Sequence, residues 1–254
     1  MAHMGRIDVV REGAIGILLI DNPPRNLLTR AMVAEFALQV GALEKDDAVH
    51  AVIVTGAGEA DFSGGLDMDE WTALPSKRAQ EEIQRGQDAL WALEHMTKPT
   101  IAAISGVCRG AGEEVALACD LRIAADTALF SHPEVDAGWM PSHGGTARLA
   151  RILGRSTATE ILLSGKPLKA LDALRLGLVD HLTRPGDALD RAKDLARMFA
   201  SKPRAAVKAI KRTLAEGEEK PYRNRFLLEA QHAVQLLWSE EYKAAVARFR
   251  EKRR

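Results

Sequence analysis

Apolar and polar positions in the first third of the chain change from short runs to helical spacing. Apolar runs at residues 7–10 and 15–20 predict two strands, with a turn at Glu12 and Gly13 between them. Across residues 29–45 apolar side chains recur every three or four positions, which predicts an amphipathic helix capped by a threonine. The predicted buried positions of this helix are Met32, Val33, Phe36, Val40 and Leu43.

The middle of the chain repeats this alternation of buried strand, loop and helix. Continuous apolar runs at residues 51–55, 100–104 and 121–124 have the length and composition of buried parallel strands. Helical patterns at residues 77–96 and 110–118 separate them, and residues 56–65 are loop-like. We therefore predict an α/β fold whose helices connect parallel strands.

Helical patterns dominate from residue 144 to the end of the chain. Apolar stripes in the last part predict packing either on the core or on a neighbouring subunit. We predict a core over residues 5–195 and a C-terminal helical region over residues 196–254. The stripe includes Phe226, Leu227, Ala230 and Val234.

The charge and the amino-acid composition limit which kinds of molecule the chain is expected to bind. The 254 residues carry 35 basic and 35 acidic side chains, so no net charge draws the chain to nucleic acid or to an anionic membrane. No apolar run approaches the roughly 18 residues of a membrane span. Cys108 and Cys119 lie in an apolar stretch, and we expect them to be buried thiols. Without a visible signal segment, we expect a cytoplasmic protein.

Two glycine-bearing turns follow predicted strands and are candidate anion sites. Residues 61–67 contain adjacent glycines, which let backbone N–H groups point into a cleft. Residues 109–115 open a helix, whose first N–H groups are free to bind developing negative charge. Either turn alone is also compatible with an ordinary strand-to-helix connection. The dinucleotide fingerprint G-x-G-x-x-G is not present in its usual place after the first strand.

Two glutamates are candidates for acid/base chemistry. Glu114 precedes an apolar helical stretch, and a buried carboxylate needs a partner or an altered pKa. Glu134 follows twenty residues later, and two carboxylates at one site can share proton donation and abstraction. The alternative is a helix-dipole partner and a loop charge. The histidines lack metal-ligand spacing, and no G-x-S-x-G elbow supports a serine triad.

Together these segments resemble the crotonase, or enoyl-CoA hydratase/isomerase, superfamily over nearly the whole chain. The similar segments are NPPRNLL (22–28), AVIVTGAG (51–58), FSGGLD (62–67), GAGEEVALACD (110–120), FSHPE (130–134) and GGTARL (144–149). The resemblance implies a spiral of ββα units with a C-terminal helical trimerisation region, and a homotrimer or a dimer of trimers. It also implies an acyl-CoA thioester substrate and no cofactor or metal besides the coenzyme A of that substrate.

The resemblance also assigns roles to residues. The backbone N–H groups of Leu66 and Ala111 are expected to hold the thioester oxygen, and Glu114 and Glu134 to be the catalytic pair. A family member with both glutamates is typically a hydratase of trans-2-enoyl-CoA. Residues expected near coenzyme A or the substrate are Arg25, Leu27, Ser63, Gly64, Gly65, Asp67, Met68, Val107, Arg109, Gly110, Pro133, Gly138 and His143. The basic end, residues 248–254, is expected to be a solvated helix end or to meet coenzyme A phosphates of a neighbouring subunit.

Several departures from the family pattern leave the reaction open. Glu113 stands beside Glu114 where a small residue is usual, and His143 is expected to point at the substrate. Trp71 and Trp139 are candidates for lining an acyl pocket. Alternatives within the family are an isomerase, a hydrolase or a decarboxylase. A more distant alternative is a non-catalytic module that binds coenzyme A or RNA.

Overall fold

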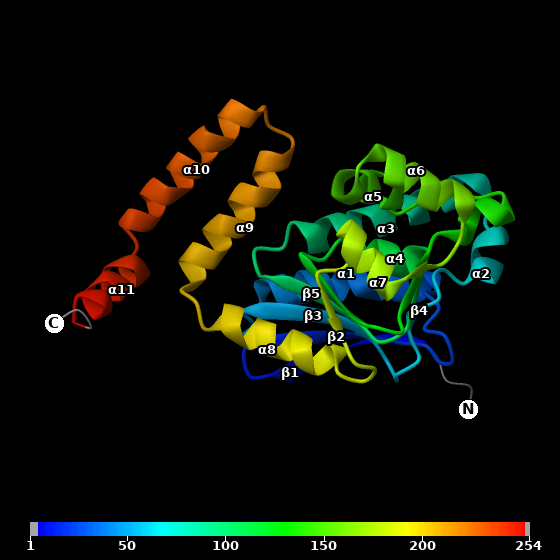
Figure 1. Cartoon of the computed structure of the whole chain (residues 1–254), viewed down its shortest axis with the longest axis horizontal. Helices are drawn as coiled ribbons and strands as arrows, with labels where there is room; N and C mark the ends of the chain where they lie inside the picture. The colour runs from blue at the N-terminus through cyan, green and yellow to red at the C-terminus, as the bar shows by residue number, and fades with distance from the viewer. Residues whose placement is uncertain (1–4, 252–254) are drawn as a thin grey trace.

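The computed structural model describes residues 5–251, and its centre is a six-stranded sheet (Figure 1). The first two strands pair antiparallel, and every later strand of this sheet joins it in parallel. The apolar runs predicted as strands therefore lie where parallel pairing buries both faces. In spatial order the strands are β1 (Arg6–Glu12), β2 (Ile15–Asp21), β3 (Ala51–Gly56), β5 (Thr100–Ile104), β7 (Leu121–Ala125) and β10 (His181–Thr183).

A second sheet of four short strands lies beside the first. Its first three strands pair in parallel, and each one directly follows a strand of the large sheet. The chain thus visits the large sheet, the small sheet and a helix in turn, which is the predicted spiral of ββα units. The strands are β4 (Asp61–Ser63), β6 (Val107–Arg109), β8 (Leu129–Ser131) and the antiparallel β9 (Leu168–Lys169).

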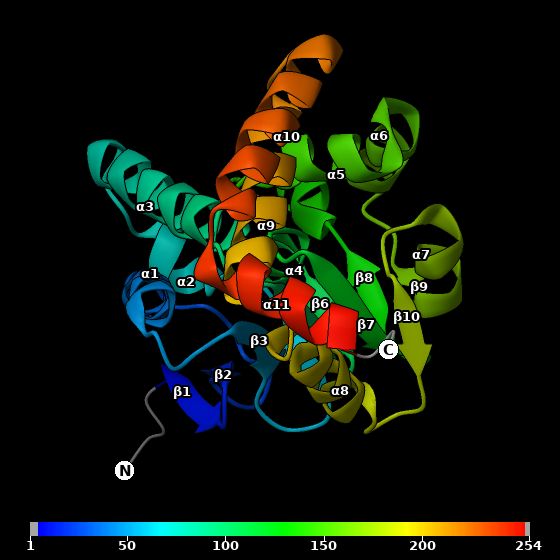
Figure 2. The same cartoon turned by 90° about the vertical axis from the view of Figure 1, so that its left-hand side faces the viewer.

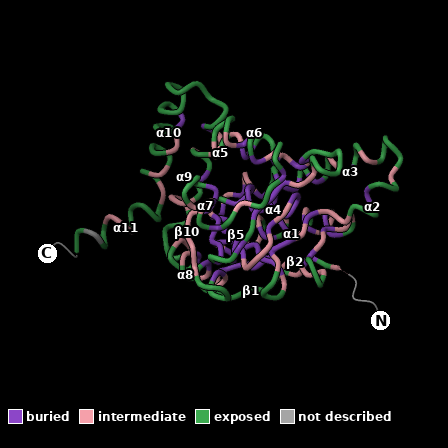
Figure 3. The backbone as a smooth tube through the Cα atoms, turned by 45° about the vertical axis from the view of Figure 1, so that its right-hand side comes forward, coloured by how far each residue is buried: buried purple, intermediate pink, exposed green. Residues whose placement is uncertain are grey.

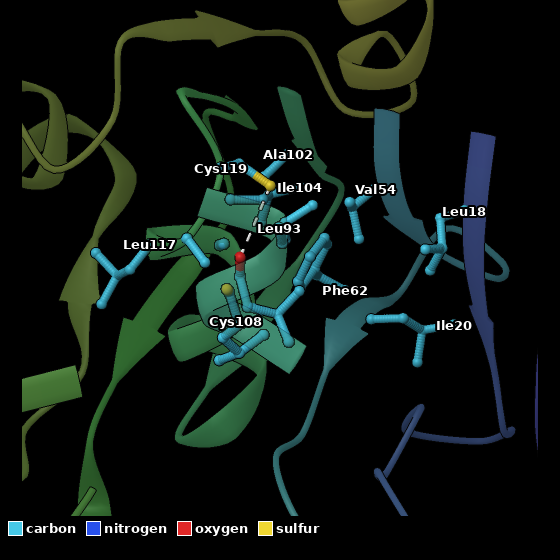
Figure 4. Packing of buried hydrophobic residues seen from close by; sticks show 14 of the residues in the cluster. Leu18, Ile20, Val54, Phe62, Leu93, Ala102, Ile104, Cys108, Leu117 and Cys119 are labelled. Carbon is cyan, nitrogen blue, oxygen red and sulfur yellow. Dashed lines mark hydrogen bonds between the residues drawn. The ribbon is translucent and has the colours of Figure 1, made fainter. Parts of the chain in front are cut away.

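Alternate residues of the large sheet face two different apolar cores. One face packs on helix α8 (Ala188–Ala200), with Ile53 and Ile101 against Ala192. The other face packs on α1 (Arg30–Lys45), α3 (Ser76–Glu94) and α4 (Ala111–Leu117). Figure 4 shows this larger core around Phe62 and Leu93, and Figure 3 shows the buried segments gathered at the centre.

Helix α1 confirms the pattern predicted for its sequence. The Thr29 hydroxyl oxygen accepts a hydrogen bond from the backbone N–H of Met32 at 3.2 Å, which satisfies one free donor of the first turn. All five predicted apolar positions of this helix are buried. Cys108 and Cys119 are also buried free thiols, as expected, and the Cys119 thiol donates to the Val115 carbonyl (Figure 4).

The last three helices extend away from the sheets (Figures 1 and 2). They are α9 (Arg204–Glu218), α10 (Tyr222–Leu237) and α11 (Glu240–Glu251). Phe226 and Leu227 remain 54% and 63% exposed, so the stripe on α10 does not pack on the core of its own chain. The predicted boundary between residues 195 and 196 falls inside α8, and that division of the chain stays a prediction.

The remaining helices are short and surround the small sheet. They are α2 (Met68–Thr72), the 3-10 helix η1 (Pro133–Ala137), α5 (Gly145–Leu153), α6 (Arg155–Ser164) and α7 (Ala170–Leu176). None of the helices within residues 5–251 combines the length and apolar character needed to cross a membrane.

The main core yields a stability prediction. Leu93 of α3 is fully buried, so Leu93→Ala removes apolar contacts and leaves a cavity. We expect the free energy of unfolding in urea to fall by about 2–5 kcal/mol. The matched control is Leu38→Ala on α1, where the side chain is 74% exposed. This control is expected to change stability by no more than about 0.5 kcal/mol. Equal losses in the two variants would contradict the assignment of the core.

Candidate active site

A cavity of about 350 Å³ opens where three strands of the small sheet end. Because β4, β6 and β8 are parallel, their carboxyl ends meet at one edge, and the turns that follow them line the cavity. The residues brought together there include most of the predicted site. They are Arg25, Leu27, Gly64, Gly65, Leu66, Asp67, Met68, Arg109, Gly110, Ala111, Glu114, Pro133 and Glu134.

Two backbone N–H groups beside this cavity have no acceptor. Among residues 5–251, neither the N–H of Leu66 nor that of Ala111 donates a hydrogen bond, although their neighbours do. Ala111 is the first residue of α4, where helix geometry leaves the N–H without a partner. Gly65, directly before Leu66, has φ of +99°, a conformation that favours glycine. The cavity therefore presents two free donors to an anionic oxygen.

Ser63 supports the first donor from behind the cavity wall. Its hydroxyl donates to the Asn26 carbonyl at 2.7 Å and accepts from the Gly65 N–H at 3.2 Å. Ser63 is fully buried and does not line the cavity. The family resemblance predicted Ser63 near coenzyme A or the substrate. In the structure its hydrogen bonds instead hold the turn that carries Leu66.

Glu114 enters the cavity from α4 as a firmly held carboxylate. Its Oε1 accepts hydrogen bonds from the backbone N–H groups of His143 and Gly145, each at 2.8 Å. Its Oε2 lies 3.5 Å from His143 Nδ1. Burial favours the neutral acid, but the contacts with His143 and Gly145 outweigh it, and the pKa of Glu114 is lowered. This side chain is thus an ionised carboxylate in a mostly apolar setting, which suits a general base.

Glu134 reaches the same cavity from η1. A Cβ atom on Gly110 would lie 2.7 Å from Glu134 Oε1, so the glycine leaves room for this carboxylate. Glu134 Oε1 is 3.6 Å from His132 Nδ1, and its Oε2 is buried without a hydrogen-bond partner. Both predicted glutamates therefore face one cavity that also holds the two free N–H groups.

Glu113 and His132 lie behind Glu134 and outside the cavity. His132 Nε2 is 3.7 Å from Glu113 Oε2, and both side chains are almost completely buried. Burial is the main cause that raises the pKa of Glu113 to about 7. For His132 burial acts in the other direction, but Glu113 and Glu134 outweigh it and raise its pKa to about 9. Glu113 therefore faces a histidine inside the protein, not solvent.

Three further predicted ligand residues lie away from the cavity lining. Val107 is half-buried in β6, and Gly138 is an exposed turn residue at the end of η1. His143 was expected to point at the substrate, but its ring is buried behind Glu114 and packs edge-on against Trp71 at 5.6 Å. The absence of a side chain at Gly86 gives the ring this space. Trp139 lines the cavity as considered from the sequence, whereas Trp71 does not.

Several residues that line the cavity were not singled out from the sequence. Asp69 of α2, Ala137 of η1 and the loop residue Met140 belong to segments too short for a periodic pattern, so only the folded chain brings them together. Within residues 5–251, no three His, Cys, Asp or Glu side chains are grouped so as to hold a metal ion. Residues 252–254 of the basic end lie outside the described residues, and its Arg248 and Arg250 belong to α11.

Alanine substitution is expected to have opposite effects on stability at two glycines in helices, one packed against His143 and one in open space. A Cβ atom on Gly86 of α3 would lie 1.9 Å from His143 Cδ2, whereas a Cβ on Gly41 of α1 would meet nothing within 4 Å. We expect Gly86→Ala to destabilise the protein by about 1–3 kcal/mol because the ring must move. Gly41→Ala is expected to stabilise it by about 0.5–1 kcal/mol through helix propensity. Urea unfolding measures both, and stabilisation by Gly86→Ala would contradict this packing.

Comparisons with known proteins agree with this geometry. The family model described as enoyl-CoA hydratase/isomerase matches residues 11–254. The short-chain-enoyl-CoA hydratase of Clostridium acetobutylicum is 32% identical, over 99% of this chain and 97% of that protein. The crotonyl-CoA hydratase of Syntrophomonas wolfei is 34% identical, over 96% and 94%. A crystal structure of an enoyl-CoA hydratase from Polaromonas sp. JS666 has a TM-score of 0.93 at 30% identity, with 98% of each chain covered. The chain belongs to the enoyl-CoA hydratase/isomerase family.

Proposed function

We propose that the protein is an enoyl-CoA hydratase that adds water syn across the α,β double bond of a trans-2-enoyl-CoA. The observation that carries this proposal is the meeting of four groups at one cavity. Two carboxylates, Glu114 and Glu134, line it together with the free N–H groups of Leu66 and Ala111. Relatives named as hydratases of short-chain enoyl-CoA and of crotonyl-CoA support the same assignment.

The two N–H groups would bind the thioester carbonyl oxygen. When water adds at Cβ, negative charge moves to this oxygen and the acyl group becomes an enolate. Donors that are already fixed in place stabilise that charge without reorganising, which lowers the barrier. Ser63 and the α4 backbone hold the donors in place before the substrate arrives.

Glu114 and Glu134 would divide the proton transfers. The Glu114 carboxylate, ionised through its backbone donors, takes a proton from the water as the oxygen attacks Cβ. Glu134 supplies a proton to Cα, and the enolate collapses to the 3-hydroxyacyl thioester. The net change is the addition of one water molecule, so no oxidant or reductant takes part.

Arginine side chains at the cavity suit the charged part of the substrate. Arg25 and Arg109 both line it, and the Arg25 side chain is 49% exposed while paired with Asp61 at 3.2 Å. Guanidinium groups bind phosphate oxygens through several donors. We propose that these residues meet the phosphates of coenzyme A, and that coenzyme A enters only as part of the substrate.

The proposed reaction predicts loss of the enoyl-thioester ultraviolet absorbance when crotonyl-CoA is added. Glu134→Gln and Glu114→Gln each remove one proton-transfer group while keeping the side-chain size, and we expect kcat to fall by about 10²–10⁴-fold in each. Lys166→Gln, on an exposed loop, is the control and is expected to leave kcat unchanged. Full activity of Glu114→Gln would favour an isomerase that relies on Glu134 alone and would contradict the hydratase.

The exposed stripe on α10 supports a second proposal, that the chain forms a homotrimer or a dimer of trimers. Tyr222, Phe226, Leu227 and Val234 are at least half exposed on this helix, and contact with further copies would remove them from water.

This proposal predicts a change in mass when charge is placed in the stripe. We expect sedimentation to give a mass of three or six chains for the unaltered protein. A Phe226→Glu, Leu227→Glu double variant is expected to sediment as a smaller species because the charges resist burial. A monomer before substitution would contradict the oligomer.

A further inference from the structure

Three ionisable side chains form a row that runs from the cavity into the protein interior. Glu134 lies at the cavity, His132 lies behind it, and Glu113 of α4 lies behind His132. The two ring nitrogens of His132 face different carboxylates: Nδ1 is 3.6 Å from Glu134 Oε1, and Nε2 is 3.7 Å from Glu113 Oε2. Only Glu134 of the three lines the cavity.

The polar atoms of this row have few other partners among the described residues, of which the Ser131 backbone beside Glu113 is one. Both oxygens of Glu113, both nitrogens of His132 and Oε2 of Glu134 are buried and make no short hydrogen bond. Burying such groups is costly unless they pair with one another. The two gaps are only slightly longer than a hydrogen bond, so each ring nitrogen lies next to one carboxylate oxygen. The nearest charged partners of His132 are therefore Glu113 and Glu134, the other two members of the row.

We propose that Glu113 and His132 form a buried proton relay behind Glu134, in which His132 passes a proton from Nδ1 to Glu134 and Glu113 keeps the imidazole charged. This inference rests on the proposed function, because Glu134 is the group that meets the substrate. His132 and Glu113 act through Glu134 and are positioning residues.

The proton transfers balance over one turnover. The Nδ1–H bond of the imidazolium breaks as an O–H bond forms on Glu134, which turns an ion pair into two neutral groups. That O–H bond then breaks as the Cα–H bond forms on the enolate, and Glu134 becomes a carboxylate again. Meanwhile Glu114 has taken one proton from the attacking water. After the product leaves, this proton returns through water in the open cavity to Glu134, and from there to His132.

The charges around His132 predict how the relay responds to pH. The titratable groups that face it are Glu113 and Glu114 of α4 and Glu134 of η1, with the buried Cys108 thiol of β6 near Glu113. All three carboxylates favour the imidazolium: Glu113 through its charge, Glu134 through its charge and a long hydrogen-bonding contact, and Glu114 least. The pKa of His132, raised to about 9, keeps its imidazole protonated at neutral pH. The charged relay therefore forms as pH rises through about 7, where Glu113 ionises, and loses its proton as pH rises through about 9.

The test compares the titration of His132 with the pH profile of kcat, using Glu113→Gln. We expect imidazole ¹⁵N chemical shifts of the full-length protein to titrate near 9 for His132, assigned by loss of its signals in His132→Gln. Removing the Glu113 charge is expected to lower that value by about one to three pH units. The alkaline limb of the kcat profile, measured with crotonyl-CoA, is expected to move down equally while KM changes little. Glu113→Asp keeps the charge and is expected to restore most of both values.

The control is Glu82→Gln, which neutralises a buried carboxylate of α3 that pairs with Arg85 at 2.8 Å, away from the cavity. It is expected to leave the pH profile unmoved. Superimposed kcat profiles of the unaltered protein and an active Glu113→Gln would overturn the relay, and so would a His132 titration that ignores Glu113. A protein that hydrates no enoyl-CoA would fail the proposed function instead. In that case the His132 titration alone decides the relay. The pKa of His132 must fall in Glu113→Gln and also in Glu134→Gln.

Discussion

The hydrogen bonds between the Glu114 carboxylate and two backbone N–H groups connect the main parts of the site. Glu114 comes from α4, while its donors, His143 and Gly145, belong to the turn that starts α5. A Cβ atom on Gly145 would lie 3.0 Å from Glu114 Oε1, so this close approach depends on glycine. The same contacts fix the turn beside the cavity and keep the buried carboxylate ionised. The shape of this turn and the proposed role of Glu114 as a base thus depend on the same buried carboxylate.

The spiral explains why the remaining groups meet this carboxylate. Each turn of the chain places a short strand in the small sheet, and the three parallel strands end at one edge. The first end supplies the Leu66 N–H, the second supplies Ala111 and Glu114, and the third supplies Glu134. Segments that are about 70 residues apart in sequence therefore converge without a dedicated binding domain.

The sequence predicted the parts of this arrangement that depend on a local pattern. The apolar spacing of α1 and the long runs of β3, β5 and β7 correspond to buried elements. Strands β4, β6 and β8 have three residues each, too few for periodicity to be recognised, and only the family resemblance implied them. The orientation of His143 was predicted wrongly because the space that Gly86 provides comes from a distant helix. Likewise, only tertiary structure places Glu113 against His132.

Isotope labelling tests the central claim, hydration through a stabilised enolate, most directly. Crotonyl-CoA is incubated with the protein in deuterated water, and the product is analysed by mass spectrometry and NMR. The account predicts 3-hydroxybutyryl-CoA with one deuterium at Cα and a hydroxyl group at Cβ. Release of free coenzyme A, or a shifted double bond without added water, would contradict hydration and assign this cavity to another reaction of the family.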